Sequence, residues 1–205
     1  MVEDLFEEEE RERIEAAVAE AETRTGAEIV VMVVRHATDY RTVEMTAAGI
    51  AALTLPAVLL PFPSVPALMI WLCQLVLFAI LGVVLPAVGV GRRLVGKARL
   101  ARDVRAAAEA EFFAHGLRDT GERAAVLIYA AMAERSVEVL CDTRASEVIG
   151  RGEWRGLAGD LARRLKAKQP IEGLTEAAAR AGDLLAPHFP PGSGTGNELP
   201  DVIVS

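Results

Sequence analysis

The strongest hydrophobic pattern in the chain is a long run without charge in its first half. The 47 residues from Met45 to Gly91 contain no Asp, Glu, Lys or Arg, although 25% of the whole chain is charged. One helix needs about 20 apolar residues to cross roughly 30 Å of hydrocarbon, so this run is too long for one span and fits two. It therefore predicts a transmembrane hairpin. The alternative is a pair of long helices buried in a soluble core.

Prolines mark the place where the two predicted helices meet. We expect the first span from about Val43 to Phe62 and the second from about Val65 to Gly89. The connection contains Pro61, Pro63 and Pro66. Proline removes a backbone donor and clashes with the preceding helical turn, so this cluster predicts the end of one helix and the start of the next.

The rest of the chain alternates between helical and strand patterns. Glu28 to Val34 and Ala124 to Met132 are continuous apolar runs, typical of strands that are buried on both faces. Ser136 to Cys141 alternates as a partly exposed strand does, and the three residues before it fit a β-hairpin. Helical patterns cover residues 7–25, 94–115, 145–149, 153–168 and 171–186.

This order of elements predicts an α/β fold, a small α/β/α sandwich with helices on both faces of a mixed sheet. The two-helix transmembrane hairpin interrupts the sandwich. We expect the first part of the domain at residues 1–42, the hairpin at 43–91, the second part at 92–189 and an extended C-terminal tail at 190–205. Both parts of the domain then leave and re-enter on the same side of the lipid bilayer.

The charge distribution refines this picture. The chain has 22 basic and 29 acidic residues and a net charge of −7, which argues against nucleic acid as a partner. Basic residues flank the hairpin, and the turn has none. By the positive-inside rule, the N- and C-terminal parts are expected in the cytoplasm and the protein in the cell inner membrane as a multi-pass protein. The acidic first residues do not fit a secretory signal.

Sequence signatures of common enzymes are missing. The chain has no P-loop, no H-E-x-x-H and no G-x-S-x-G motif. Its three histidines, His36, His115 and His188, lack the spacing of metal ligands. Cys141 begins the segment Cys-Asp-Thr-Arg, where a thiol nucleophile is one interpretation, but a phosphate-cradling loop would contain glycines. We therefore interpret Cys141 as a structural cysteine, and the sequence indicates no catalytic set.

Acidic residues lie in loops beside the ends of the predicted strands. Asp119, Glu122, Glu134 and Asp142 occupy such positions, and Asp142 directly follows the third strand, where an α/β sheet presents its crevice. Carboxylate oxygens suit a hard cation, so Asp142, Glu134 and Asp119 form a candidate Ca²⁺ site. The alternative is that these residues form turns and cap helices.

An aromatic residue among arginines is a further candidate. Trp154 opens a predicted helix, with Arg151 and Arg155 close to it. We interpret this tryptophan as an anchor that docks the helix on the sheet, with a substrate platform as the alternative.

Taken in order, several segments resemble the TPM-domain family, which includes a plastid thylakoid-lumen protein and many bacterial membrane proteins. The resemblance covers about three-quarters of the chain. Its segments are Ala-Glu-Ile-Val-Val-Met-Val-Val at 27–34, Phe-Phe-Ala-His-Gly-Leu at 112–117, Ala-Val-Leu-Ile-Tyr at 125–129, Ala-Glu-Arg-Ser-Val-Glu-Val-Leu at 133–140, then Asp142 and Trp154, and finally Phe-Pro at 189–190 with Asn-Glu-Leu-Pro-Asp at 197–201.

The resemblance implies two functions. The first is an interaction or maintenance module for membrane protein complexes, with a LemA-type membrane protein as the implied partner. The second is an acid-phosphatase-like hydrolase that depends on calcium, in which Asp142 matches the acidic site and Glu134 comes second. The chain departs from better-known members because its hairpin splits the domain after the first strand. We favour the interaction module over the enzyme.

Overall fold

The computed structural model describes residues 5–61, 66–117, 124–191 and 202–204. The chain forms two compact units, one made of residues 1–37 and 101–205 and the other of residues 38–100. The first unit is therefore discontinuous in sequence. The second unit begins before the predicted hairpin and ends after it, because it also includes residues 38–42 and 92–100.

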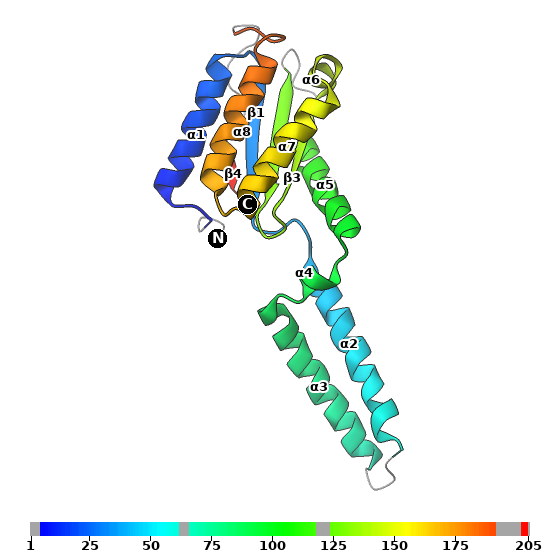
Figure 1. The fold of residues 1–205 in the computed structure, drawn as a ribbon. Coiled ribbons are helices and arrows are strands. Elements are labelled where there is room, and N and C mark those ends of the chain that lie inside the picture. The colour runs from blue at the N-terminus through cyan, green and yellow to red at the C-terminus, as the bar shows by residue number, and fades with distance from the viewer. Residues whose placement is uncertain (1–4, 62–65, 118–123, 192–201, 205) are drawn as a thin grey trace. The chain divides into compact units, whose positions relative to one another are not determined.

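The discontinuous unit is built on a four-stranded sheet. Its strands are β1 (Glu28–Val34), β2 (Ala125–Ala131), β3 (Ser136–Cys141) and β4 (Val202–Val204), in the order β3-β2-β1-β4. β1 runs parallel to both β2 and β4, whereas β3 runs antiparallel to β2. The sheet is thus mixed, and the α/β class predicted from the sequence is confirmed (Figure 1).

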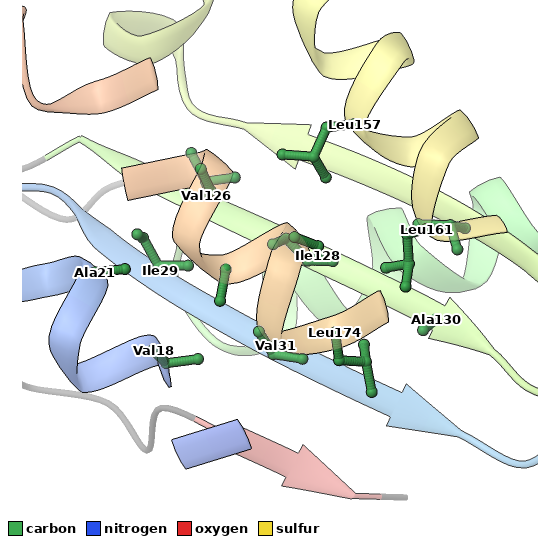
Figure 2. Close-up of a cluster of buried hydrophobic side chains, with 14 of the residues drawn as sticks. Val18, Ala21, Ile29, Val31, Val126, Ile128, Ala130, Leu157, Leu161 and Leu174 are labelled. Carbon is green, nitrogen blue, oxygen red and sulfur yellow. The ribbon is translucent and has the colours of Figure 1, made fainter. Parts of the chain in front are cut away.

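Three helices cover one face of this sheet. They are α1 (Glu8–Thr23), α7 (Arg151–Lys166) and α8 (Pro170–Leu185) (Figure 1). Figure 2 shows apolar side chains of α1, α7 and α8 packed over those of β1 and β2. Burying one such side chain stabilises the fold by about 1.5–3 kcal/mol. The labelled members of this cluster are Val18, Ala21, Ile29, Val31, Val126, Ile128, Ala130, Leu157, Leu161 and Leu174.

The opposite face is covered by α5 (Lys97–Ala114), which packs Val104, Ala108 and Phe112 against the sheet. Alternate residues of β1 and β2 point to this side, and all seven residues of each strand are buried. Burial on both faces explains why these two segments are continuous apolar runs and not alternating ones. The prediction of two central strands is confirmed.

A close approach between α1 and α8 requires a glycine. A Cβ added to Gly182 would lie 2.9 Å from the Cβ of Ala21 and 3.1 Å from its carbonyl oxygen. Any side chain at this position would push the two helices apart. The small residues therefore fix how closely α1 packs beside α8.

The end of the chain contributes to the sheet. The tail from residue 190 was expected to be extended, and Val202–Val204 indeed form an edge strand, β4, parallel to β1. Val202 is buried in the same core cluster as α1 and α8. Residues 192–201 of the predicted tail lie outside the described residues. The sequence did not indicate which surface this short apolar segment packs on, because strand pairing is a long-range contact.

The continuous unit contains two long apolar helices, α2 (Tyr40–Leu59) and α3 (Ala67–Val88), followed by the short α4 (Gly91–Leu94). α2 begins three residues before the predicted span because Asp39 caps it by accepting a hydrogen bond from the Arg41 amide at 3.0 Å. Residues 62–65, where the two predicted spans meet, lie outside the described residues.

A hydrogen bond joins the two ends of the uncharged run. Glu44, on α2, is buried and accepts a hydrogen bond from the Gly91 amide at 2.9 Å. A Cβ on Gly91 would lie 2.6 Å from Glu44 Oε1 and 2.7 Å from the Cβ of Tyr40. The carboxylate thus satisfies an amide at the start of α4, and the glycine makes room for it.

The outer surfaces of α2 and α3 are apolar. Both helices are long and apolar enough to cross a membrane, and their most hydrophobic 18-residue windows are only 17% and 6% buried in the structure. Most of the large hydrophobic side chains exposed in the described parts of the chain belong to these two helices, among them Leu53, Val58, Leu68, Trp71, Val76 and Val83. Helices of a soluble core would bury these side chains.

Candidate functional site

Asp142 lies at the edge of the sheet where β1 and β2 begin. Its amide donates to the carbonyl oxygen of Ala125, the first residue of β2, at 3.0 Å. Its side chain caps α6 (Thr143–Val148) by accepting from the Ala145 amide at 2.8 Å. Burial raises the pKa of this carboxyl, and the backbone hydrogen bonds oppose that rise. Asp142 is therefore a helix cap, the alternative considered for it from the sequence.

The expected position of Asp142 at the sheet's crevice was wrong, for a topological reason. The crevice of an α/β sheet lies beyond the carboxyl ends of its parallel strands. Because β3 runs antiparallel to β2, the end of β3 lies beside the start of β2. Asp142 therefore lies at the opposite edge of the sheet from the one predicted.

Glu134 lies in the turn between β2 and β3, at the other end of β3 from Asp142. Six strand residues, roughly 17 Å of chain, separate the two positions. Glu134 instead lies near Tyr129, where burial and the charges of Glu111 and Glu134 raise the pKa of the phenol to about 12. The structure does not bring Glu134 and Asp142 together.

The third predicted ligand, Asp119, lies outside the described residues, as does Glu122. Within the described parts of the chain, no group of three or more His, Cys, Asp or Glu residues is arranged to hold a metal ion. The predicted Ca²⁺ site therefore cannot be built from Asp142 and Glu134 as a pair.

The discontinuous unit has a groove of about 480 Å³ along β3. We call it the β3 groove. One wall is the strand itself, from Val137 to Cys141, and the others come from α6, α7 and the side chain of Arg105 on α5. The α6–α7 side is formed by Ser146, Ile149, Arg151, Trp154, Arg155 and Ala158.

Trp154 combines the two roles considered for it from the sequence. The residue is 5% exposed and belongs to the core cluster that docks α7 on the sheet, so its role as an anchor is confirmed. It also lines the β3 groove. Its indole Nε1–H is buried and donates to no acceptor within the described part of the chain. A buried donor without an acceptor costs about 1–3 kcal/mol, so a ligand that supplied one would gain affinity.

Two arginines on the same face of α7 border the groove. Arg151 and Arg155 lie three residues before and one after Trp154, so all three side chains share one side of the helix. Both arginines are exposed, and neither makes an ion pair with any residue that the structure describes. Further along α7, by contrast, Arg163 pairs with Asp160 and Arg164 pairs with Glu176 at 2.6 Å.

The opposite side of the groove carries no excess positive charge. Arg105 lies 2.9 Å from Glu109 and 3.7 Å from Glu138, so its single positive charge is outnumbered by two carboxylates. Burial raises the pKa of Glu138, and the charge of Arg105 opposes this. The uncompensated positive charge at the groove therefore comes from α7.

Cys141 also lines the groove, but its thiol is not activated. Burial, together with the charge of Asp142, raises the pKa of Cys141 to about 11, and Arg151 opposes this shift only in part. A nucleophilic cysteine needs the opposite shift, because the thiolate is the reactive form. The interpretation of Cys141 as a structural residue agrees with this environment.

β3 is the last strand of the sheet, so its outer backbone edge faces the groove. Hydrogen-bonded and non-hydrogen-bonded pairs alternate along an antiparallel ladder. Since Asp142 bonds to Ala125, the register directs the N–H and C=O groups of Val137, Val139 and Cys141 away from β2. These groups have no strand partner in the sheet as described.

The sequence contained part of this site. The alternation in residues 136–141 predicted a partly exposed strand, and the spacing of Arg151, Trp154 and Arg155 places them on one helical face. That the strand and this face border the same groove depends on the strand order, which local patterns do not specify.

Comparison with known proteins adds information on the fold. No protein-family model matches the chain, and no curated protein matches it. The chain is similar to BA42 protein from the psychrophilic bacterium Bizionia argentinensis, whose structure was solved by NMR, with a TM-score of 0.60. The alignment covers 99% of this chain and 97% of BA42, at 18% sequence identity. At this identity the likeness concerns the fold alone.

Proposed function

We propose that this chain is an integral membrane protein of the TPM-domain type, whose α/β unit is an interaction or maintenance module for membrane protein complexes. The observation that carries the proposal is the apolar surface of α2 and α3, which are 20 and 22 residues long. Exposing such a surface to water is unfavourable, and helices of this length match the thickness of a bilayer. The lipid bilayer is thus the first proposed partner.

The proposed topology places both parts of the α/β unit in the cytoplasm, on the inner side of the cell inner membrane. Arg35 and Arg41 precede the apolar run, and Arg92, Arg93 and Lys97 follow it. Basic residues near the ends of a span favour the cytoplasmic side.

The proposed partner is another membrane protein. The motif resemblance to the TPM-domain family supports this, since it implies membrane-complex maintenance and a LemA-type partner. The features of the β3 groove, an unpaired strand edge and a buried donor without an acceptor, are also those of a binding surface.

The alternative, a calcium-dependent phosphatase, receives less support. It requires carboxylates that converge on a cation beside a phosphate. Glu134 and Asp142 lie at opposite ends of β3, and the described residues contain no metal-ligating cluster.

Membrane extraction tests the central part of this proposal. The full chain, expressed in a bacterial host, should stay with the membrane pellet after washing with sodium carbonate at high pH and with urea, and detergent should release it. Hydrophobic insertion resists both washes, whereas a peripheral protein held by charge is released. Recovery in the carbonate supernatant would contradict the proposal.

A matched variant identifies the segment responsible. Charges placed at Leu72, Val76 and Ile80 of α3 cost about 2.5–3.5 kcal/mol each near the centre of a membrane helix. The variant Leu72→Arg, Val76→Arg, Ile80→Arg should move to the soluble fraction. Three arginines at exposed positions in and directly after α7, Gly152, Gly159 and Ala167, should leave the wild-type distribution unchanged, because this segment belongs to the other unit.

A further inference from the structure

We infer that the β3 groove binds an extended acidic segment of a partner protein, which adds to the sheet as a strand beside β3. This inference rests on the proposed role as an interaction module and names the site and the chemistry of the partner. Three features of the groove support it: the backbone of β3, the charge of α7 and the indole of Trp154.

The free backbone edge of β3 can pair with an extended chain. The outward N–H and C=O groups of Val137, Val139 and Cys141 alternate along the free edge, at the spacing that another strand offers. The groove follows five consecutive residues of this strand, which is longer than a small anion requires. Strand addition of this kind draws its affinity from main-chain hydrogen bonds and its specificity from alternate side chains.

The positive charge at the α7 wall of the groove favours acidic side chains in the bound segment. On an added strand, every second side chain points toward the face covered by α7, where Val137, Val139 and Cys141 also point. Those side chains meet Arg151 and Arg155, which have no carboxylate partner within the described chain, at the wall of the groove. Glutamate or aspartate at alternate positions would complement them. On the other side, Arg105 is already paired with Glu109 and Glu138.

The indole N–H of Trp154 is a hydrogen-bond donor without an acceptor in the described structure. Trp154 lines the groove, and its Nε1–H is buried. A carboxylate or carbonyl oxygen of the bound segment would satisfy it. Because the same residue lies between Arg151 and Arg155 on α7, one acidic strand reaches all three groups.

The test uses the full chain in nanodiscs of neutral phosphatidylcholine, so that lipid charge does not attract the probe. The probe is a short fluorescein-labelled peptide in which valine alternates with glutamate, and binding is followed by anisotropy. Three matched peptides serve as controls: one with lysine for glutamate, one with a scrambled order, and one N-methylated at every second amide on the edge that would pair with β3.

We expect the acidic peptide to bind and the three control peptides to bind at least about tenfold more weakly. Arg151→Glu with Arg155→Glu should weaken binding of the acidic peptide by about tenfold, because two exposed ion pairs are lost and the reversed charges add repulsion. Arg163→Glu is the control on the same helix. This variant should leave binding unchanged, because Arg163 lies outside the groove.

Two further measurements locate the site. In a Trp71→Phe background, Trp154 is the remaining tryptophan, so its fluorescence should change when the acidic peptide binds. Val139→Pro removes one outward N–H of β3 without removing a hydrogen bond to β2, since proline is tolerated on an edge strand in this orientation. The Val139→Pro variant should bind the acidic peptide more weakly than the wild type does, and its far-UV circular dichroism should be unchanged.

Several outcomes would overturn the inference. They are the absence of binding by the acidic peptide, equal binding by the lysine or N-methylated peptide, and insensitivity to the double arginine variant. Free glutamate or inorganic phosphate should not displace the labelled peptide as effectively as unlabelled peptide does. If either displaces it equally well, the groove is a site for small anions instead. Carbonate extraction of the same samples separates this result from the proposed membrane role, because the arginine variants should remain in the membrane whether or not they bind the peptide.

Discussion

At the scale of single residues, burial sets the chemistry of the β3 groove. Trp154 is held in the core yet keeps one polar atom without an acceptor, and Cys141 is held as a thiol. Asp142, next to Cys141, is occupied in capping α6. These environments leave the groove with hydrogen-bond donors and positive charge but without an activated nucleophile. They suit binding more than covalent chemistry.

The thiol of Cys141 gives a direct test of this environment. In a Cys73→Ala variant, alkylation by iodoacetamide should be slow at pH 8 and should still be rising at pH 10, because the thiolate of Cys141 forms only near its raised pKa of about 11. Mass spectrometry of the modified peptide measures the rate. A plateau below pH 9 would contradict the environment described, and a free cysteine peptide under the same conditions is the control.

The same shift has a consequence for stability. A thiol whose pKa is higher in the folded than in the unfolded state binds its proton more tightly when folded. The fold therefore loses stability as the pH rises from about 9 to about 11 and keeps this contribution in full below pH 9.

At the scale of elements, two close approaches depend on glycine. Gly182 allows α8 to pack beside α1, and Gly91 allows Glu44 to cap the start of α4. The second contact links the residue just before the uncharged run to the last residue of that run. It holds the first turns of α2 to the segment that follows α3. The buried carboxylate has a clear structural purpose there, which the sequence did not indicate.

Replacing Gly91 by alanine should open this link. The added Cβ would clash with Glu44 and Tyr40, at a cost of about 1–3 kcal/mol. Amide hydrogen exchange in residues 89–97, measured by mass spectrometry in detergent micelles, should become roughly fivefold faster or more. Gly96→Ala is the matched control, since no atom lies within 4 Å of its added Cβ. Equal exchange in the two variants would show that the link contributes nothing.

At the scale of the whole molecule, the chain combines an α/β unit divided in sequence with an inserted helical unit. The insertion follows β1 directly, so the first strand and its partner β2 are separated in sequence by the whole helical unit. They nevertheless pair along all seven residues. The sheet must therefore form after the inserted helices have been synthesised.

The membrane orientation can be tested with reporters. We expect green fluorescent protein fused after Ser205 to fluoresce, and alkaline phosphatase at the same position to be inactive, because the basic flanks favour the cytoplasm. Alkaline phosphatase inserted between Pro63 and Ser64 should be active, since the proposed turn lies outside. The reverse pattern would contradict the proposed orientation. It would still agree with insertion of the two helices in the membrane.

The sequence by itself determined the local elements of this protein. Hydrophobic periodicity reports the burial of nearby residues, so it located β1, β2 and β3, the helices around them and the long apolar run to within a few residues. The local pattern also predicted the β-hairpin that makes β3 antiparallel to β2, whereas only the tertiary structure decided the rest of the strand order and the pairing of β4 with β1. These pairings join residues far apart in the chain, and local patterns carry no record of them. The predicted hairpin already separates Glu134 from Asp142 by the length of β3, so grouping them as ligands was inconsistent with it. The long-range packing of α7 on the sheet instead brought Trp154 and two arginines to the free edge of β3.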